Sequence, residues 1–221
     1  MTQLRKKPTL DRESELLHAG ARIVACVDEV GRGAIAGPVV LGVTLLTAPL
    51  FPMPAGIRDS KLLSSKARQR ILPQIEDWAL STAVGSASAE EIDELGIMKA
   101  MGLAGQRALE RISLLRIDAH NLDPRDDVVL LDGNINYLKG YTDLRVVTQT
   151  KADLTCAGVA AASIVAKCHR DSVMRELALA YPGYGFESNK GYASAQHIQA
   201  LSDLGASAQH RRSWTLPGIP G

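Results

Sequence analysis

The stretch Ile23-Val24-Ala25-Cys26-Val27-Asp28-Glu29-Val30-Gly31-Arg32-Gly33 joins an apolar run to two adjacent carboxylates and a glycine-rich turn. The apolar run predicts a buried strand. Carboxylates seldom lie against a core unless a cation compensates them, so Asp28 and Glu29 are candidate metal ligands. Because side chains alternate along a strand, both acids reach one ion only if the strand ends or bends, which Gly31 and Gly33 allow. The alternative is a strand that ends in solvent.

The sequence on either side of this stretch predicts a mixed sheet flanked by helices. The apolar run 39–46 is continuous enough to be covered on both faces, and we expect it to pair with the first strand. Further strands are predicted over residues 81–87, 128–131 and 144–148. Helices are predicted over 11–19 (capped by Asp11), 64 or 65 to 80, 96 to about 115, 153–180 and 193–204. This order of elements indicates an α/β fold with a helical C-terminal extension.

Composition restricts the class of protein. With 221 residues, 46% of them hydrophobic and 22% charged, the chain is expected to form one soluble domain with a small appendage, not a disordered or fibrous protein. No apolar stretch is long enough to span a bilayer, and the basic start Met1–Pro8 has no apolar segment behind it, so we expect a cytoplasmic protein. The cysteines, Cys26, Cys156 and Cys168, are expected to be free thiols.

Charge is distributed unevenly along the chain. Residues 1–132 carry 16 basic and 18 acidic groups, whereas residues 133–221 carry 9 and 6. This shift weakly indicates that the later part contacts a polyanion. The short basic run His210-Arg211-Arg212 is compatible with phosphate contact and equally with a solvated tail.

Two more carboxylates lie at the ends of predicted core elements. Asp132 follows the strand 128–131 and precedes Gly133, where the alternative is an Asp-Gly turn. Asp153 opens the long helix, where the alternative is an acid stabilised by the helix dipole. The ends of core elements are where α/β sheets gather functional groups. Four carboxylates can hold two hard cations such as Mg²⁺ or Mn²⁺, a site suited to phosphodiester hydrolysis.

The first motif resembles that of a known family. Val27–Gly33, followed by Ala36-Gly37-Pro38-Val39, closely resembles the first motif of bacterial ribonuclease HII. Later segments resemble that family's motifs in the same order: Asp59–Ser64, Leu131–Asn134, Ala161–Lys167, Asn189–Tyr192 and His210–Trp214. The resemblance covers about residues 23 to 214, so it is far more specific than a single motif.

The resemblance implies a ribonuclease H-like fold and activity. We expect a five-stranded mixed sheet in a catalytic domain, residues 1–180, and a helical extension, residues 181–221, that contributes to substrate binding. The implied reaction is hydrolysis of the RNA strand of RNA–DNA hybrids and incision 5′ of single ribonucleotides in duplex DNA, with two Mn²⁺ or Mg²⁺ ions, leaving 5′-phosphate and 3′-hydroxyl ends. The implied partners are these duplexes, with no membrane and no obligate protein partner, and the protein is expected to be a monomer.

Residue roles follow from the resemblance. Those implied as catalytic metal ligands are Asp28, Glu29, Asp132 and Asp153. Those implied to bind substrate are Gly31, Arg32, Gly33, Lys61, Ser163 and Tyr192. The glycine-arginine-glycine loop is implied to contact the 2′-hydroxyl that distinguishes RNA from DNA. Tyr192 is implied to pack on the following deoxynucleotide, and Lys61 and Ser163 to touch the nucleic-acid backbone.

Two departures from the family pattern occur. Val30 stands where alanine is more common, which should be tolerated. Ala152 replaces a frequent glycine, and its Cβ restricts the backbone that aims Asp153. Three alternatives are a ribonuclease HIII-like enzyme without junction selectivity, a non-catalytic hybrid-binding relative, and a resolvase or integrase of the same fold. Arg32 and its flanking glycines argue against a ribonuclease HIII-like enzyme and against a resolvase or integrase. The complete set of four carboxylates argues against a non-catalytic binding protein.

Overall fold

The computed structural model describes residues 7–116 and 127–219, and it contains a five-stranded mixed sheet. The strands are β1 (Ile23–Val30), β2 (Val39–Thr47), β3 (Ser81–Ala87), β4 (Val128–Asp132) and β5 (Arg145–Gln149). Their spatial order is β3-β2-β1-β4-β5. The first three pair antiparallel, whereas β4 pairs parallel to β1 and β5 parallel to β4. The predicted α/β class and the predicted pairing of the first two strands are confirmed.

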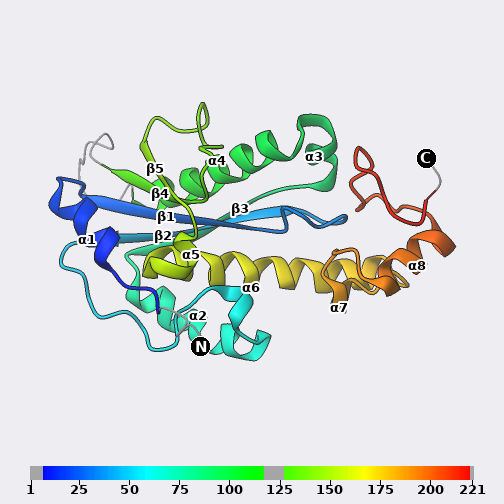
Figure 1. The fold of residues 1–221 in the computed structure, drawn as a ribbon, viewed down its shortest axis with the longest axis horizontal. Coiled ribbons are helices and arrows are strands. Elements are labelled where there is room, and N and C mark those ends of the chain that lie inside the picture. Colours follow the sequence, from blue (N-terminus) through cyan, green and yellow to red (C-terminus); the bar gives the residue numbers. More distant parts are fainter. Residues whose placement is uncertain (1–6, 117–126, 220–221) are drawn as a thin grey trace, which may run out of the picture.

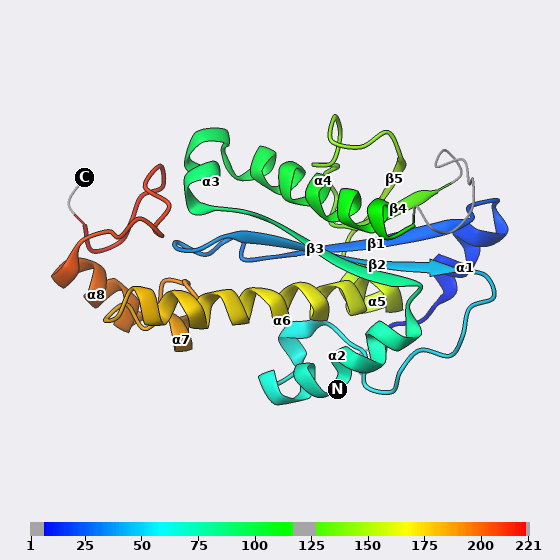
Figure 2. The same ribbon diagram turned by 180° about the vertical axis from the view of Figure 1, so that it is seen from behind.

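Helices cover both faces of the sheet (Figures 1 and 2). The main chain forms α1 (Asp11–His18), η1 (Ser60–Leu62), α2 (Ser65–Trp78), α3 (Ala89–Leu95), α4 (Ile97–Arg116), α5 (Ala152–Thr155), α6 (Ala157–Ala180), α7 (Phe186–Asn189) and α8 (Ala195–Leu204). In both views α3 and α4 lie on one side of the sheet, and α2, α5 and α6 lie on the other. β2 is buried along nearly its whole length, as the continuous apolar run predicted.

Small residues let α6 lie close to the sheet. Its first half is rich in alanine and is buried from Ala157 to Ala166. A Cβ built on Gly42 of β2 would lie 2.3 Å from the carbonyl oxygen of Ala162. A Cβ built on Gly158 would lie 2.4 Å from Sγ of Cys26 in β1. Any side chain at Gly42 or Gly158 would overlap these atoms. The position of α6 against β1 and β2 therefore depends on both glycines.

Several predicted boundaries were wrong. β1 does not end at Val27 but continues through the carboxylates, because its pairing with β2 extends to Val30. The helix predicted from 153 to 180 is two helices, since Cys156 is extended and forms a bridge with Thr9. Asp11 is not a cap: Leu10 holds the N-cap position of α1.

The C-terminal extension has its own small core. Its helices α7 and α8, one of them absent from the prediction, pack around Tyr184 and Phe186. The same cluster includes Ile35 and Ala36 from the loop after β1 and Met174 from α6. α8 begins at Ala195, two residues later than predicted, because Ser194 caps it. The extension therefore packs on the loop that carries the glycine-arginine-glycine segment. Within the described parts of the chain, no helix is long and apolar enough to cross a membrane.

Candidate active site

The register of two parallel strands brings two of the carboxylates together. β1 and β4 pair with Val27 beside Leu131, so Asp28 and Asp132 follow at matching positions on neighbouring strands. β4 ends at Asp132, which pairs with Gln149 at the end of β5. The carboxylates therefore lie at the carboxyl edge of the parallel part of the sheet, where α/β proteins place their functional groups.

Asp28 is the most deeply buried of the four carboxylates, with 3% of its surface exposed. Burial raises the pKa of Asp28 well above its ordinary value, and the nearby charges of Glu29, Asp132 and Asp153 raise it further. A hydrogen bond with Ser163 of α6 opposes this shift. The ionised form of Asp28 is thus costly without a compensating cation.

Glu29 points to the opposite face of the sheet from Asp28. Its Oε2 accepts a hydrogen bond of 3.2 Å from the hydroxyl of Tyr137, which belongs to the core beneath α4. Nη1 of Arg32 lies 3.8 Å from its Oε1. Burial raises the pKa of Glu29, the charge of Asp132 adds to the shift, and Arg32 opposes it. The strand does not bend at Glu29, so the side chains of Asp28 and Glu29 approach Asp132 from opposite faces of the sheet.

Asp132 is bonded to the start of the helix that carries Asp153. Its Oδ1 accepts hydrogen bonds from the backbone N–H groups of Ala152, at 2.6 Å, and Asp153, at 3.4 Å. Ala152 is helical and buried, and the left-handed backbone falls on Lys151, with φ of 59°. The expected restriction at Ala152 is therefore absent. Burial raises the pKa of Asp153, the charge of Asp132 adds to this, and Lys61 opposes it from 3.5 Å.

The donor set fits a hard divalent cation. It consists of carboxylate oxygens alone, and burial, reinforced by mutual repulsion, raises the pKa of Asp28, Glu29 and Asp153. In the described residues, no three potential ligand side chains converge closely enough to hold an ion as they stand. Asp132 is turned to Ala152 and Asp153 to Lys61. A cation bound by Asp153 would therefore compete with Lys61 for its carboxylate.

The glycine-arginine-glycine loop and Tyr192 are joined through the backbone. The carbonyl oxygen of Gly191 accepts hydrogen bonds from the N–H groups of Ile35, at 2.9 Å, and Ala36, at 3.1 Å. Tyr192 is 39% exposed. Arg32 and Gly33 are also exposed, and a Cβ built on Gly33 would meet nothing within 4 Å. Both predicted recognition elements thus present accessible surface from one connected unit.

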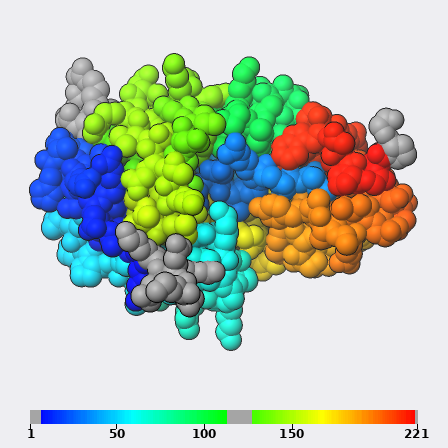
Figure 3. All heavy atoms as spheres, viewed as in Figure 1, coloured from blue at the N-terminus to red at the C-terminus, as the bar shows by residue number. Residues whose placement is uncertain are grey.

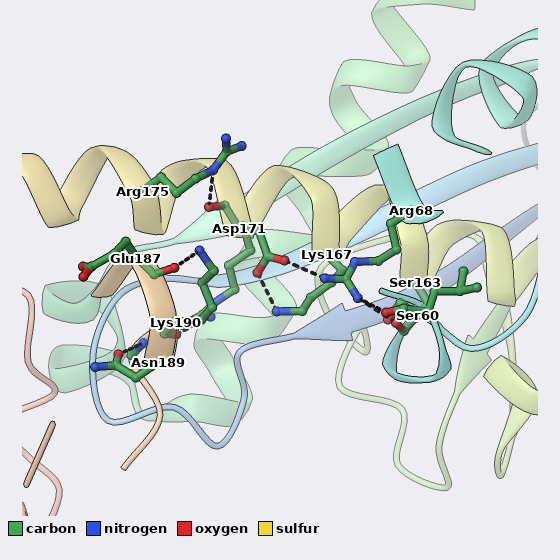
Figure 4. A network of polar contacts seen from close by, with 12 residues as sticks. Ser60, Arg68, Ser163, Lys167, Asp171, Arg175, Glu187, Asn189 and Lys190 are labelled. Atoms are coloured by element: carbon green, nitrogen blue, oxygen red, sulfur yellow. Dashed lines mark hydrogen bonds and ion pairs between the residues drawn. The ribbon is translucent and has the colours of Figure 1, made fainter. Parts of the chain in front are cut away.

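A polar network between α6 and η1 connects Ser163 to Ser60, which precedes Lys61 in the η1 turn (Figure 4). The hydroxyl groups of Ser163 and Ser60 lie 2.7 Å apart. Arg68 of α2 donates to the carbonyl oxygen of Ser60 at 2.9 Å and to Asp171 of α6, also at 2.9 Å. This network holds the η1 turn against α6, so the exposed Lys61 stays beside Asp153.

Three residues that sequence reasoning did not assign belong to the site or its support. Tyr137 holds Glu29, and the fully buried Arg170 and Arg211 lie behind the loop. For the His210–Arg212 run, neither interpretation holds throughout, because His210 and Arg211 are buried and only Arg212 is exposed. The sequence held no signal that singled out Arg170, because the second half of α6 carries several other charged side chains, among them Lys167 and Asp171.

The sheet order and the carboxylates at its carboxyl edge define a ribonuclease H-like hydrolase. The ribonuclease HII family model matches residues 25–216. Ribonuclease HII of Streptomyces avermitilis is 43% identical over 204 residues, which are 91% of this chain and 81% of the relative. The chain belongs to the ribonuclease HII family, and is a type 2 ribonuclease H, which cleaves the RNA strand of RNA–DNA hybrids.

Solved structures share the fold. Ribonuclease HII of Archaeoglobus fulgidus, determined as a complex with PCNA, superposes with a TM-score of 0.68 at 25% identity and covers 86% of this chain and 93% of its own. Bst ribonuclease HIII in complex with Mn²⁺ superposes with a TM-score of 0.66 at 22% identity and covers 92% of this chain and 68% of its own. The predicted five-stranded ribonuclease H-like fold is confirmed.

Proposed function

We propose that the protein incises a duplex 5′ of a ribonucleotide, including a single ribonucleotide embedded in DNA, and leaves 5′-phosphate and 3′-hydroxyl ends. One observation carries the proposal: the four carboxylates gather beside a loop that is bonded to the segment of Tyr192. A general hybrid nuclease needs only the carboxylates. The connected loop and tyrosine add a surface that can read one ribose and its neighbour.

Two Mg²⁺ or Mn²⁺ ions, when bound, would activate the attacking water and stabilise the leaving oxygen. Asp28, Glu29, Asp132 and Asp153 are the residues that would hold them. Lys61, which lies 3.5 Å from Asp153 and is exposed, would be released from this carboxylate to face a phosphate. A divalent requirement is in keeping with the Mn²⁺ complex of the Bst ribonuclease HIII relative.

Recognition is assigned to the exposed loop and tyrosine. Gly33 lacks a side chain at an open position, so its backbone can approach a 2′-hydroxyl closely. The ring of Tyr192 has an exposed surface on which the following deoxynucleotide can stack. The face in Figure 3 places the blue loop after β1 between the segment after β4, in lime, and the orange and red extension. A duplex lying across this face would contact all three.

The remaining expectations belong to the same proposal. Residues 1–180 would form the catalytic domain, and residues 181–221 the extension that contributes to substrate binding. The protein would act as a cytoplasmic monomer on duplexes, without an obligate protein partner. Sedimentation of the free protein and of its complex with a short duplex tests the monomer, since a 2:1 complex would contradict it.

The activity is tested on a DNA duplex that contains one ribonucleotide. We expect a single cut on its 5′ side with Mg²⁺ or Mn²⁺, none after EDTA, and none in the all-DNA duplex. Asp28→Asn should abolish cleavage while the protein stays folded, and the control Asp143→Asn, an exposed carboxylate before β5, should cleave normally. Cutting that survives the chelator, or an active Asp28→Asn variant, would contradict the proposal.

A further inference from the structure

Two fully buried arginines lie directly behind the recognition loop. Arg211 donates to the carbonyl oxygens of Gly31 at 2.6 Å, of Arg32 at 2.8 Å and of Gly37 at 3.1 Å. Its own backbone N–H donates to Ile35 at 3.0 Å. Arg211 thus bonds to the loop along most of its length, from a position 180 residues later in the sequence.

Arg170 completes the arrangement from α6. It donates to the carbonyl oxygens of Pro38 at 2.8 Å, of Ala36 at 3.1 Å and of Lys190 at 2.7 Å. Its guanidinium lies 5.5 Å from the ring centroid of Tyr192. The same residue therefore contacts both the loop and the segment of the tyrosine.

Among the described residues, both guanidinium groups donate their hydrogen bonds to backbone carbonyl oxygens and to no carboxylate. A buried charge is costly unless its hydrogen bonds are made, so carbonyl groups that stabilise it must stay in place. A planar guanidinium fits several carbonyl groups at fixed angles, and lysine does not reproduce that geometry. The two arginines are therefore suited to fixing the loop in one shape.

We propose that Arg211, supported by Arg170, is a positioning residue for ribonucleotide recognition, which sets the backbone of Gly31–Gly33 for contact with the 2′-hydroxyl. This inference rests on the proposed function. It gives Arg211 of the basic run 210–212 a role inside the protein, in place of phosphate contact. It also explains why Gly31 has no side chain, because a Cβ there would lie 2.1 Å from Nε of Arg170.

The test compares Arg211→Lys with Arg145→Lys, an exposed arginine at the far end of β5. Both changes are made in the uncleaving Asp28→Asn background, and affinity is measured for a duplex with one ribonucleotide and for the same all-DNA duplex. We expect Arg211→Lys to reduce the preference for the ribonucleotide by about tenfold while affinity for DNA changes less than about twofold. Arg145→Lys should keep the preference. An equal loss of affinity for both duplexes, or an unchanged preference, would overturn the proposal.

Amide hydrogen exchange of the free protein provides a readout that does not depend on substrate. In Arg211→Lys we expect faster exchange, by about tenfold or more, in residues 31–38 and unchanged exchange in β4. If the parent protein shows no preference for the ribonucleotide, the proposed function fails, and this exchange result alone decides whether Arg211 positions the loop. If Arg211→Lys does not fold, Arg211→Gln is measured in the same way. Failure of both to fold would make Arg211 a general core residue and overturn the inference.

Discussion

The Oδ1 atom of Asp132 lies 2.6 Å from the backbone nitrogen of Ala152, so the carboxylate that ends β4 is bonded to the first residue of α5. This bond joins two parts of the site that are separated by 20 residues. It also sets the start of the helix on which Asp153 is carried. The orientation of Asp153 therefore depends on Asp132 as well as on its own backbone.

Asp132→Asn removes the negative charge of this residue but keeps an oxygen that can accept its hydrogen bond. The amide oxygen can still accept from Ala152, so we expect the free energy of unfolding to change by less than about 1 kcal/mol. Loss of the negative charge should reduce cleavage by on the order of 10³-fold, because cation-assisted stabilisation contributes several kcal/mol. Single-turnover rates and urea denaturation measure the two effects. A folded variant that cleaves at the normal rate would exclude Asp132 as a ligand.

Tyr137→Phe removes the hydroxyl that donates to Glu29. Tyr137 is buried, and burial together with the charge of Glu29 raises the pKa of its hydroxyl well above the ordinary value, so it acts as a donor. We expect cleavage to fall by about tenfold, since a hydrogen bond to a charged group contributes about 1.5–3 kcal/mol. Tyr181→Phe, at the end of α6, is the control. Equal rates for both variants would show that Glu29 does not need this bond.

The two glycines of the recognition loop should respond differently to alanine. Gly31 has a φ of 85°, and its new Cβ would overlap the buried Arg170, so Gly31→Ala should lower the free energy of unfolding by about 2–4 kcal/mol. Gly33 faces open space, and Gly33→Ala should cost less than about 0.5 kcal/mol. Urea denaturation of the two variants checks the difference. Comparable stability losses would contradict the placement of Arg170 behind Gly31.

Glu13 links α1 to the start of α6. Its Oε1 accepts from the backbone N–H of Gly158 at 2.7 Å, and Oε2 has no hydrogen-bond partner among the described residues. Burial raises the pKa of Glu13 from 4.5 to about 7, against the lowering effect of the Gly158 bond. Between these pH values the folded protein keeps a proton that the unfolded chain has released, so this group reduces stability as the pH rises.

Glu13→Gln should remove that pH dependence. The free energy of unfolding of the variant, minus that of the parent protein, should be larger at pH 8 than at pH 5 by on the order of 2–3 kcal/mol, so the variant gains relative stability as the pH rises. Urea denaturation at the two pH values measures the difference, with Glu15→Gln, an exposed neighbour on α1, as the control. Parallel pH profiles for the parent and Glu13→Gln would mean that Glu13 titrates normally.

A buried pair of histidines supports the segment of Tyr192. Nδ1 of His197 lies 2.8 Å from the carbonyl oxygen of Tyr192 and therefore carries a proton. Its Nε2 must then accept the bond of 3.0 Å from Nε2 of His210. His210 Nδ1 accepts in turn from the backbone N–H of Ser207 at 3.0 Å. One neutral tautomer of each imidazole ring satisfies this series of hydrogen bonds. An additional proton on either ring would break one of the bonds.

Acid should therefore weaken the extension. Burial lowers the pKa of His210 from 6.5 to about 4, and the neighbouring His197 adds to the shift. Between these values the unfolded chain binds a proton that the folded protein excludes, so stability falls as the pH falls from 6.5 toward 4. We expect a loss of about 2 kcal/mol at pH 5 that is reduced in His210→Gln. His18→Gln, exposed on α1, should retain the parent profile under urea denaturation.

Local chemistry made most of the architecture predictable. Apolar runs located β1, β2 and β4, and the helix predicted to start at residue 64 or 65 matches α2, which Ser64 caps. The break at Cys156 could not be predicted, because it arises from pairing with Thr9, which is remote in sequence. Similarly, Asp28 and Glu29 were expected at a strand end, whereas pairing with β2 extends the strand beyond them.

The sequence by itself determined the family, the α/β class and which carboxylates to examine, because strand-forming runs, turn residues and motif order are local properties. Only the tertiary structure decided that Asp28 and Glu29 use opposite faces of β1, that Asp132 holds the start of α5, and that Arg211 lies inside the protein behind Gly31. The physical reason is burial. A charged side chain has the same local sequence signal whether it meets water or carbonyl groups, and long-range packing alone determines which of these surrounds it.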